Sequence, residues 1–247
     1  MVLALTSGVS FLLKGTQISA QTSHEGAKAE VLINPQNKQD ISGFANICYA
    51  FGARLTQSYE IKRGLINLKD AMLKWTRIDT KLDTPLNLSS PQIKKMPFVY
   101  ISFDKVFDLT EPEKDNIRDY LMNGGFMVIE NINPNLDNNP ASSTFANMFR
   151  EVLEGRGRFA PIPNDHPIFH SFFDFSEPPR GMETSLIEIR HIEGVWIGDR
   201  LAAVYSNKRY VVKWNDYTNN EPQLKMGINM LVFALTQRGG IAITNYR

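Results

Sequence analysis

The segment from Asn164 to His170 has the side chains best suited to chemistry, because it combines a carboxylate with two imidazoles. Asp165 precedes His166, and a second histidine, His170, follows four residues later. Imidazole and carboxylate groups bind divalent metals and transfer protons in acid–base catalysis. Asp165, His166 and His170 are therefore candidate ligand-binding residues, and the two histidines are candidate metal ligands.

The same segment also has a structural interpretation. Pro167 suits the first turn of a short helix, and Asp165 or His166 would then be the residue that caps it. Phe169 and Phe172 lie close to the histidines in the sequence, which favours packing against a core. We favour capping and packing over a ligand or metal role, and the sequence leaves both open.

Polar side chains also follow two near-continuous apolar runs, residues 97–103 and 126–130, each of which predicts a strand buried on both faces. Asp104 comes directly after the first run, whereas Glu130 ends the second and Asn131 follows it. Ligands bind outside the carboxyl ends of strands in an open α/β sheet. We therefore expect these three side chains on one rim, with Asp104 or Glu130 as a candidate general base.

Another strand is predicted over residues 44–51, and the loop that follows it should bring Arg54 to the same rim. If the histidine segment folds over this rim, carboxylates and imidazoles would form one mixed site. Such a site would suit a divalent metal or acid–base chemistry, although the sequence itself predicts no cofactor. Its members would be Asp104, Glu130, His166 and His170.

The elements that must position these residues alternate between strands and helices. Apolar residues recur at helical spacing from Ile61 to Trp75, and Thr110 with Glu113 forms a predicted capping box at the start of another helix. This alternation is typical of a parallel sheet with right-handed crossovers. Residues 193–214 read as short strands joined by turns, which would add antiparallel strands at one side. The predicted strands are 44–51, 77–82, 97–103 and 126–130, and the predicted helices are 61–75, 110–123, 142–153 and 222–235.

The composition excludes several classes of protein. The chain has 247 residues with 43% apolar content, which suffices for one sizeable core and a single domain over residues 43–247. The net charge is +1 without a dense Lys/Arg run, so we expect no nucleic-acid partner. Cys48 is the only cysteine, which excludes an intramolecular disulfide and a CxxC zinc site.

The N-terminal residues suggest export. Residues 1–13 are largely apolar, and Ile18-Ser19-Ala20 before Gln21 is similar to a signal-peptide cleavage site, although the usual basic residues are absent. We expect residues 1–20 to form a signal peptide or apolar leader and residues 21–42 a linker or extended arm. The protein would then be periplasmic or in the cell envelope, or cytoplasmic if the leader is not a signal. Membrane association would involve this segment alone.

Several segments together resemble one bacterial family. From about Phe44 to Thr236 the chain is similar to the domain-of-unknown-function 4159 family, which belongs with the class I glutamine amidotransferase-like folds, near the ThuA-like proteins. The resemblance implies a three-layer, flavodoxin-like α/β fold, frequent association with the envelope and no established activity. The segments that carry it are Phe98–Tyr100, Leu109–Glu113, Leu121–Phe126, Asp165–His170, Leu201–Asn207 and Met226–Leu235.

This chain lacks the nucleophile that a glutaminase of such a fold requires. A glutaminase needs a Cys on a strained turn, a His that activates it and backbone donors for the oxyanion. The turn expected to hold it, residues 130–133, has neither Cys nor Ser. Cys48 belongs to another predicted strand, where a buried structural thiol is expected. We predict that the chain is not a glutaminase.

Two functions from different classes remain. The first is a non-catalytic module that binds a small molecule or an envelope protein at the strand-end rim. The alternative is a metal-assisted hydrolase or isomerase acting on a sugar-like substrate, with Asp104 or Glu130 as base and His166 as ligand or acid. This alternative requires the three side chains to lie within about 10 Å of one another, because first-shell ligands lie about 2 Å from one metal. A lesser hypothesis is a membrane-complex subunit anchored by its leader.

Overall fold

A computed structural model describes residues 26–247 of the chain except residues 56–58, 106, 134–139 and 183–190. The expected leader, residues 1–20, lies outside the described residues. In the described part, every helix is too short or too polar to cross a lipid bilayer.

The described residues form ten strands, five α-helices and two short 3₁₀ helices. The strands are β1 (Ala29–Asn34), β2 (Asn37–Phe51), β3 (Arg77–Leu82), β4 (Leu86–Asn87), β5 (Phe98–Phe103), β6 (Met127–Asn131), β7 (Arg158–Pro161), β8 (Glu193–Ile197), β9 (Arg200–Ser206) and β10 (Ile243–Tyr246). The helices are α1 (Tyr59–Trp75), η1 (Pro91–Lys95), α2 (Glu111–Met122), α3 (Pro140–Val152), η2 (Pro167–Phe169), α4 (Tyr210–Trp214) and α5 (Glu221–Thr236).

The parallel strands have the order of a flavodoxin-like sheet. Strand β2 pairs in parallel with β3 and β5, and the parallel pairing continues through β6 to β9. Ile47 lies opposite both Leu82 of β3 and Phe98 of β5, so these two strands lie on opposite edges of β2. The parallel order is therefore β3-β2-β5-β6-β9, which confirms the predicted fold class.

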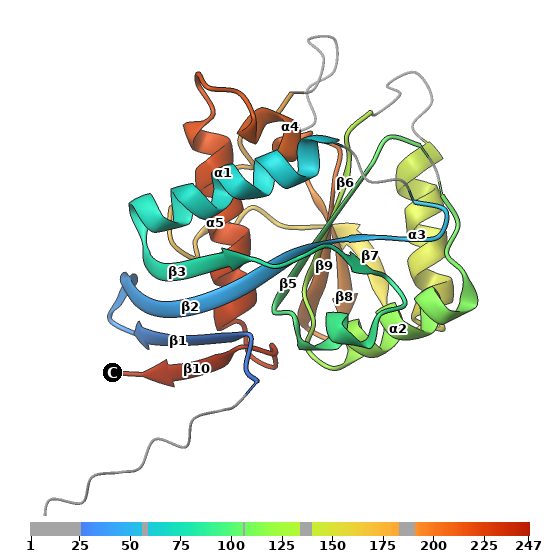
Figure 1. The fold of residues 1–247 in the computed structure, drawn as a ribbon, viewed down its shortest axis with the longest axis horizontal. Helices are drawn as coiled ribbons and strands as arrows, with labels where there is room; N and C mark the ends of the chain where they lie inside the picture. Colours follow the sequence, from blue (N-terminus) through green and yellow to red (C-terminus); the bar gives the residue numbers. More distant parts are fainter. Residues whose placement is uncertain (1–25, 56–58, 106, 134–139, 183–190) are drawn as a thin grey trace, which may run out of the picture.

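The sheet lies between two layers of helices (Figure 1). Helices α1, α4 and α5 cover one face, and α2 and α3 cover the other. Residues of β5 alternate between the two cores: Phe98 and Tyr100 pack on the first face, Val99 and Ile101 on the second. This alternation explains why the strand reads as a continuous apolar run.

Antiparallel strands extend the sheet at β9, as predicted. Strand β8 pairs antiparallel with β9, and β7 with β8. The other side was not foreseen: β1 pairs antiparallel with β2, and β10 pairs in parallel with β1. Within the expected linker or extended arm, residues 21–42, residues 29–42 belong to the sheet apart from the turn between the strands. Val31 and Ile41 are buried there, because the first half of β2 extends the core.

Residues 210–214, expected within the late strands, form helix α4 instead. The residue before it, Arg209, has φ of 59° and ψ of 41°, a left-handed conformation that ends the extended backbone. Tyr210 and Trp214 on this helix are buried. The turn and the contacts made by α4 outweigh the strand preference of its β-branched and aromatic residues.

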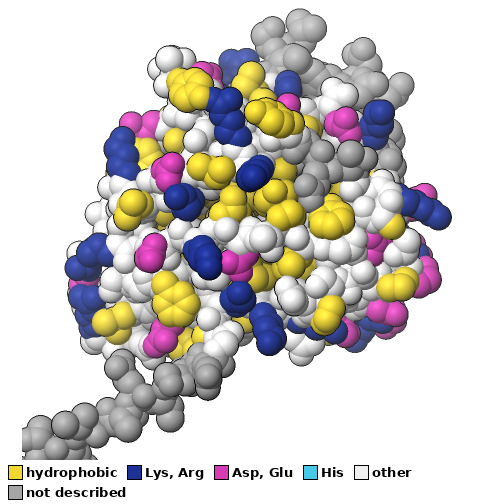
Figure 2. Space-filling model, in the orientation of Figure 1, with side chains coloured by type: hydrophobic (Ala, Val, Ile, Leu, Met, Phe, Trp, Pro, Cys, Tyr) yellow, Lys and Arg dark blue, Asp and Glu magenta, His cyan; other side chains and the backbone are white. Residues whose placement is uncertain are grey.

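The face of the molecule that carries α1 has side chains of both charges (Figure 2). Exposed hydrophobic residues lie among them, including Tyr59, Leu73 and Tyr217. Arg63 stacks on the Tyr217 ring, with its guanidinium carbon 4.9 Å from the ring centroid. These apolar side chains are interspersed with charged ones, as on ordinary protein surfaces.

Candidate functional site

Glu130 lies in β6 and is completely buried. Its carboxylate accepts hydrogen bonds from the hydroxyls of Tyr100, at 2.8 Å, and Ser206, at 3.1 Å. The backbone N–H groups of Tyr210 and Val211 also donate to it, each at 2.7 Å. Burial raises the pKa of Glu130, whereas the four donors oppose that rise. The expectation of a rim carboxylate available as a general base is wrong for Glu130, because its oxygens are buried and accept hydrogen bonds from the protein itself.

The turn between β9 and α4 resembles a hydrolase turn whose anion position is already filled. A nucleophile elbow places its nucleophile on a strained strand-to-helix turn, and the N–H of the next residue helps to bind the oxyanion. Here the left-handed residue is Arg209, and the N–H groups of Tyr210 and Val211 point at Glu130. A left-handed turn with N–H groups directed at a carboxylate thus follows β9.

Cys48 is the buried structural thiol that the sequence predicts. Its side chain is fully buried in β2. Burial raises the pKa of the thiol to about 12, so at neutral pH almost none of it is the reactive thiolate.

The other rim candidates lie where the sequence predicts them. Asp104 follows β5 and is exposed. Phe103, the residue before it, lies opposite Asn131 of β6, so the ends of these two strands are neighbours. Asn131 is buried, and its amide oxygen accepts a hydrogen bond from the N–H of Asn133 at 3.0 Å. Asn131 therefore shapes the turn that follows β6.

Arg54 reaches this end of the sheet from the loop after β2. Its guanidinium lies 3.6 Å from the carboxylate of Asp108, and both side chains are largely exposed. The buried carboxylate of Glu113 fixes the loop by accepting from the N–H of Ala53 at 2.7 Å. The same carboxylate accepts from the N–H and the hydroxyl of Thr110, each at 2.8 Å. The predicted capping pair therefore also positions the loop that carries Arg54.

A crevice of about 630 Å³ opens beside these loops. Its walls come from the loops after β2 and β5 and from helices α2 and α3. Lys114 in its wall forms ion pairs with Glu111 and Glu151. The polar residues that line it are Arg54, Asp108, Thr110, Glu111, Lys114, Thr144, Asn147 and Glu151.

This crevice lies at the topological switch point of the sheet. From β2 the chain crosses to β3 on one edge, and β5 lies on the other edge. In doubly wound sheets the loops diverge at this point and leave a crevice outside the carboxyl ends of the two strands. Arg54 and Asp108 belong to those two loops, so the switch point was predictable once the strand order was known.

His166 caps a short helix, as the structural interpretation predicts. Its Nδ1 accepts a hydrogen bond from the N–H of Ile168 at 3.2 Å. The ring packs against Trp196 and Phe233, with centroids 5.2 Å from each. Burial lowers the pKa of His166, and Asp165 opposes this shift. The ring is therefore neutral at neutral pH.

The histidine segment does not reach the rim, so the predicted gathering of Asp104, Glu130, His166 and His170 is wrong. Trp196, which contacts His166, pairs with Leu201 near the start of β9, whereas Glu130 pairs with Ser206 at its end. Five residues of strand separate these positions by about 16 Å.

This separation removes the metal site on which the hydrolase alternative depends. Among the residues that the structure describes, no group of three or more His, Cys, Asp and Glu side chains could hold a metal ion. The two histidines and the rim acids thus belong to different ends of the molecule.

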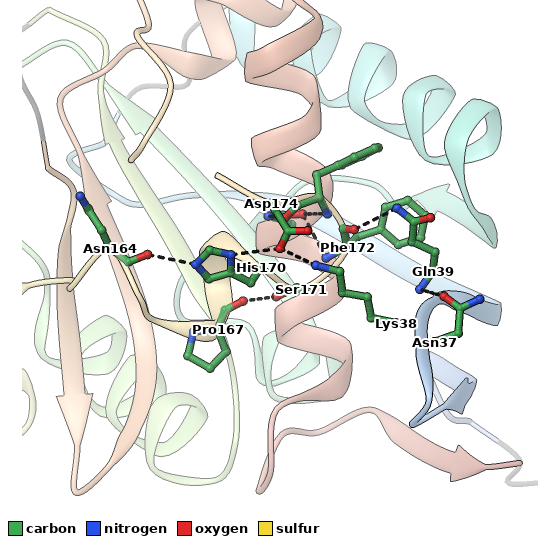
Figure 3. A network of polar contacts seen from close by, with 11 residues as sticks. Asn37, Lys38, Gln39, Asn164, Pro167, His170, Ser171, Phe172 and Asp174 are labelled. Carbon is green, nitrogen blue, oxygen red and sulfur yellow. Dashed lines mark hydrogen bonds and ion pairs between the residues drawn. The ribbon is translucent and has the colours of Figure 1, made fainter. Parts of the chain in front are cut away.

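His170 joins a polar network between its own segment and the start of β2 (Figure 3). Its Nδ1 lies 3.1 Å from Oδ1 of Asp174, and its Nε2 lies 3.1 Å from the carbonyl oxygen of Asn164. Lys38 of β2 donates to the same oxygen of Asp174 at 2.5 Å. The spacing of His170 and Asp174 could have suggested their contact, whereas nothing in the sequence pointed to Lys38.

Asn229 of α5 anchors the backbone that follows η2. Its amide oxygen accepts from the N–H groups of Phe172, at 3.2 Å, and Phe173, at 2.8 Å. Its amide nitrogen donates to the carbonyl oxygen of Phe173 at 2.8 Å. Asn229 is completely buried, and sequence reasoning assigned it no role.

The capping role of His166 predicts a pH effect on stability. The unfolded chain protonates this imidazole near pH 6.5, whereas burial lowers the pKa in the folded state. The unfolded state therefore binds more protons below pH 6.5, and the free energy of unfolding should fall as the pH drops through this value. In His166→Asn this part of the pH dependence should disappear, because Asn caps a helix without titrating.

Guanidinium unfolding at pH 7.5 and pH 5.5 would measure the effect. His191→Asn, which changes an exposed histidine, is the matched control and should retain the pH dependence. A His166 pKa at or above 6.5 in an NMR titration of the folded protein would contradict the prediction.

The strand order, the two helical layers and the switch-point crevice define an α/β domain of the flavodoxin-like class. Residues 44–235 match the family described as Domain of unknown function (DUF4159), and the chain belongs to this family. A solved structure described as a ThuA-like protein, from Bacteroides uniformis ATCC 8492, is similar with 12% sequence identity and a TM-score of 0.44. The similarity covers 80% of this chain and 94% of that one. No curated protein matches this chain.

Proposed function

We propose that this chain is a non-catalytic binding module whose ligand occupies the crevice between the loops after β2 and β5. The observation that carries the proposal is the position of this crevice at the switch point, where doubly wound sheets bind their ligands. The occupied anion position at the β9–α4 turn supports a binding role, because Glu130 takes the backbone donors that acyl chemistry would need.

The residues of the crevice suit a small polar ligand that both donates and accepts hydrogen bonds. Arg54 is exposed and only loosely paired with Asp108, so its guanidinium is available to a ligand. Thr110 and Asn147 add a hydroxyl and an amide among charges of both signs. A sugar, an amino acid or a polar segment of an envelope protein has matching groups. Location in the envelope remains a prediction from residues 1–20.

Thermal unfolding of the full chain with a panel of sugars, amino acids and small carboxylates would test the proposal. A ligand at 100 times its dissociation constant should raise the free energy of unfolding by about 2.7 kcal/mol. Arg54→Gln should lose most of this gain, because it removes the exposed guanidinium, whereas Lys114 is already paired with two glutamates. Lys69→Gln, on α1 at the other face of the sheet, should keep it.

Two results would contradict this function. A stabilisation that survives in Arg54→Gln would place the ligand elsewhere. Turnover of a panel compound that Asp104→Asn abolishes would show an enzyme, because Asp104 is the exposed carboxylate at the end of β5.

A further inference from the structure

A second hollow, of about 620 Å³, lies at the opposite end of the sheet from the crevice. His166 and His170 line it from the η2 segment, Lys38 lines it from β2, and Gln237 and Arg238 line it from the end of α5. Figure 3 shows how closely β2 and the η2 segment approach each other here. Parts of the chain that are distant in sequence therefore meet around one space.

His166 presents a fixed hydrogen-bond donor in the wall of this hollow. Because the N–H of Ile168 donates to its Nδ1, that nitrogen carries no proton. The proton of the neutral ring must then be on Nε2. Within the described part of the chain, this Nε2–H group makes no hydrogen bond. The helix cap thus sets the tautomer and leaves a donor for a ligand.

Two neighbouring side chains also have unused hydrogen-bonding groups. The amide nitrogen and oxygen of Gln237 are buried and lack a hydrogen-bond partner among the described residues. Buried polar groups are nearly always paired, so an unpaired amide beside a hollow suggests a missing partner. Arg238 is exposed and forms no ion pair with any described residue.

The charges around the hollow differ in their exposure. Arg200 is half-buried, and its guanidinium donates to the carbonyl oxygens of Gly125, at 3.0 Å, and Leu121, so no carboxylate neutralises it there. The two acids that line the hollow, Asp165 and Asp199, are exposed. Solvent and salt screen exposed charges more than buried ones. The inner part of the hollow therefore favours negative charge.

We propose that this hollow is a second binding site, for a small oxyanion of the carboxylate or phosphate class held by Nε2–H of His166 and the guanidinium of Arg238. The Gln237 amide would complete the hydrogen bonding. The network of Lys38, Asp174 and His170 would hold the outer wall in place.

NMR titration of the full chain at pH 7.5 and constant ionic strength would test the site. Long-range proton–nitrogen spectra should show the proton of His166 on Nε2. Inorganic phosphate or malonate, added separately, should shift these ring signals to saturation, and the tighter of the two identifies the class. Arg238→Gln and His166→Asn should each weaken binding at least tenfold. Because His166→Asn lacks the ring signals, the backbone amide signal of Ile168 would report binding in that variant.

The controls separate this site from the crevice. Arg150→Gln removes an exposed arginine of α3 and should bind the anion as the wild type does. Arg54→Gln should also leave anion binding unchanged, whatever it does to the proposed ligand of the crevice. Non-saturating shifts, equal shifts with chloride, or unchanged affinity in Arg238→Gln would overturn the oxyanion site.

Discussion

Glu130→Ala is expected to lower the free energy of unfolding by about 4 kcal/mol, one of the largest effects of a single substitution in this chain. The change removes the acceptor of four hydrogen bonds in a fully buried place. The hydroxyls of Tyr100 and Ser206 can rotate toward other acceptors, but the N–H groups of Tyr210 and Val211 cannot. Each unsatisfied buried donor costs about 1–3 kcal/mol.

Guanidinium unfolding monitored by tryptophan fluorescence would measure this loss, because Trp214 lies on the helix that Glu130 caps. Glu130→Gln should fall between the wild type and Glu130→Ala, since its amide keeps one acceptor oxygen. Asp104→Ala is the matched control, and as a change at an exposed acid it should stay within about 0.5 kcal/mol. A loss below about 1 kcal/mol in Glu130→Ala, the least expected for one unsatisfied donor, would show that the carboxylate does not hold α4.

Asn229→Ala should cost about 3 kcal/mol and should also disturb the hollow beside His170. The substitution leaves the N–H groups of Phe172 and Phe173 without an acceptor and the carbonyl of Phe173 without a donor. The N–H of Phe172 is buried and the two groups of Phe173 are partly buried where the segment after η2 packs on α5, so water replaces the lost partners poorly. The segment should loosen, and with it the contact between His170 and Asp174.

Two measurements separate local from global effects. Guanidinium unfolding gives the stability loss, and hydrogen exchange of the Phe172 and Phe173 amides should become faster than that of β5 amides in the same variant. Asn147→Ala, at an exposed position of α3, is the control and should change neither. Slow exchange of both amides in Asn229→Ala would contradict an anchoring role.

The parts of the fold that were predictable from sequence depend on local patterns of residue types. Strand β5 reads as a continuous apolar run because its alternate residues enter two cores. Helix α2 starts where Thr110 and Glu113 predict, because both residues of the capping pair are close in sequence. Such signals do not depend on where the rest of the chain goes.

Helix α4 depends on a contact that a local pattern cannot contain. Its first N–H groups bond to Glu130, which precedes Tyr210 by 80 positions. Without that contact, Tyr210, Val211 and Val212 have the residue types of a strand. Strand β1 and the start of β2 were missed for a similar reason, because these residues belong to the sheet through their pairing with β10 and β3, which are distant in sequence.

In the candidate site, likewise, some residues could be placed from the sequence and others could not. The position of Arg54 follows from the general rule for strand ends, so this residue could be placed from the strand order alone. The position of His166 depends on the route of residues 162–175, which bring its ring against Trp196 of β8 and Phe233 of α5. A carboxylate–imidazole pattern shows which groups are available, but it does not show at which end of the sheet they lie.

The pairing of β1 with β10 has a consequence for the order in which the protein can be completed. Glu30 lies opposite Ile243, so the outer edge of β1 stays open during translation until residues 243–246 have left the ribosome. An open edge of this kind can pair with another nascent chain. Strand β10 therefore also covers this edge of β1, and a chain cut short before residue 243 would expose the edge to pairing with another chain.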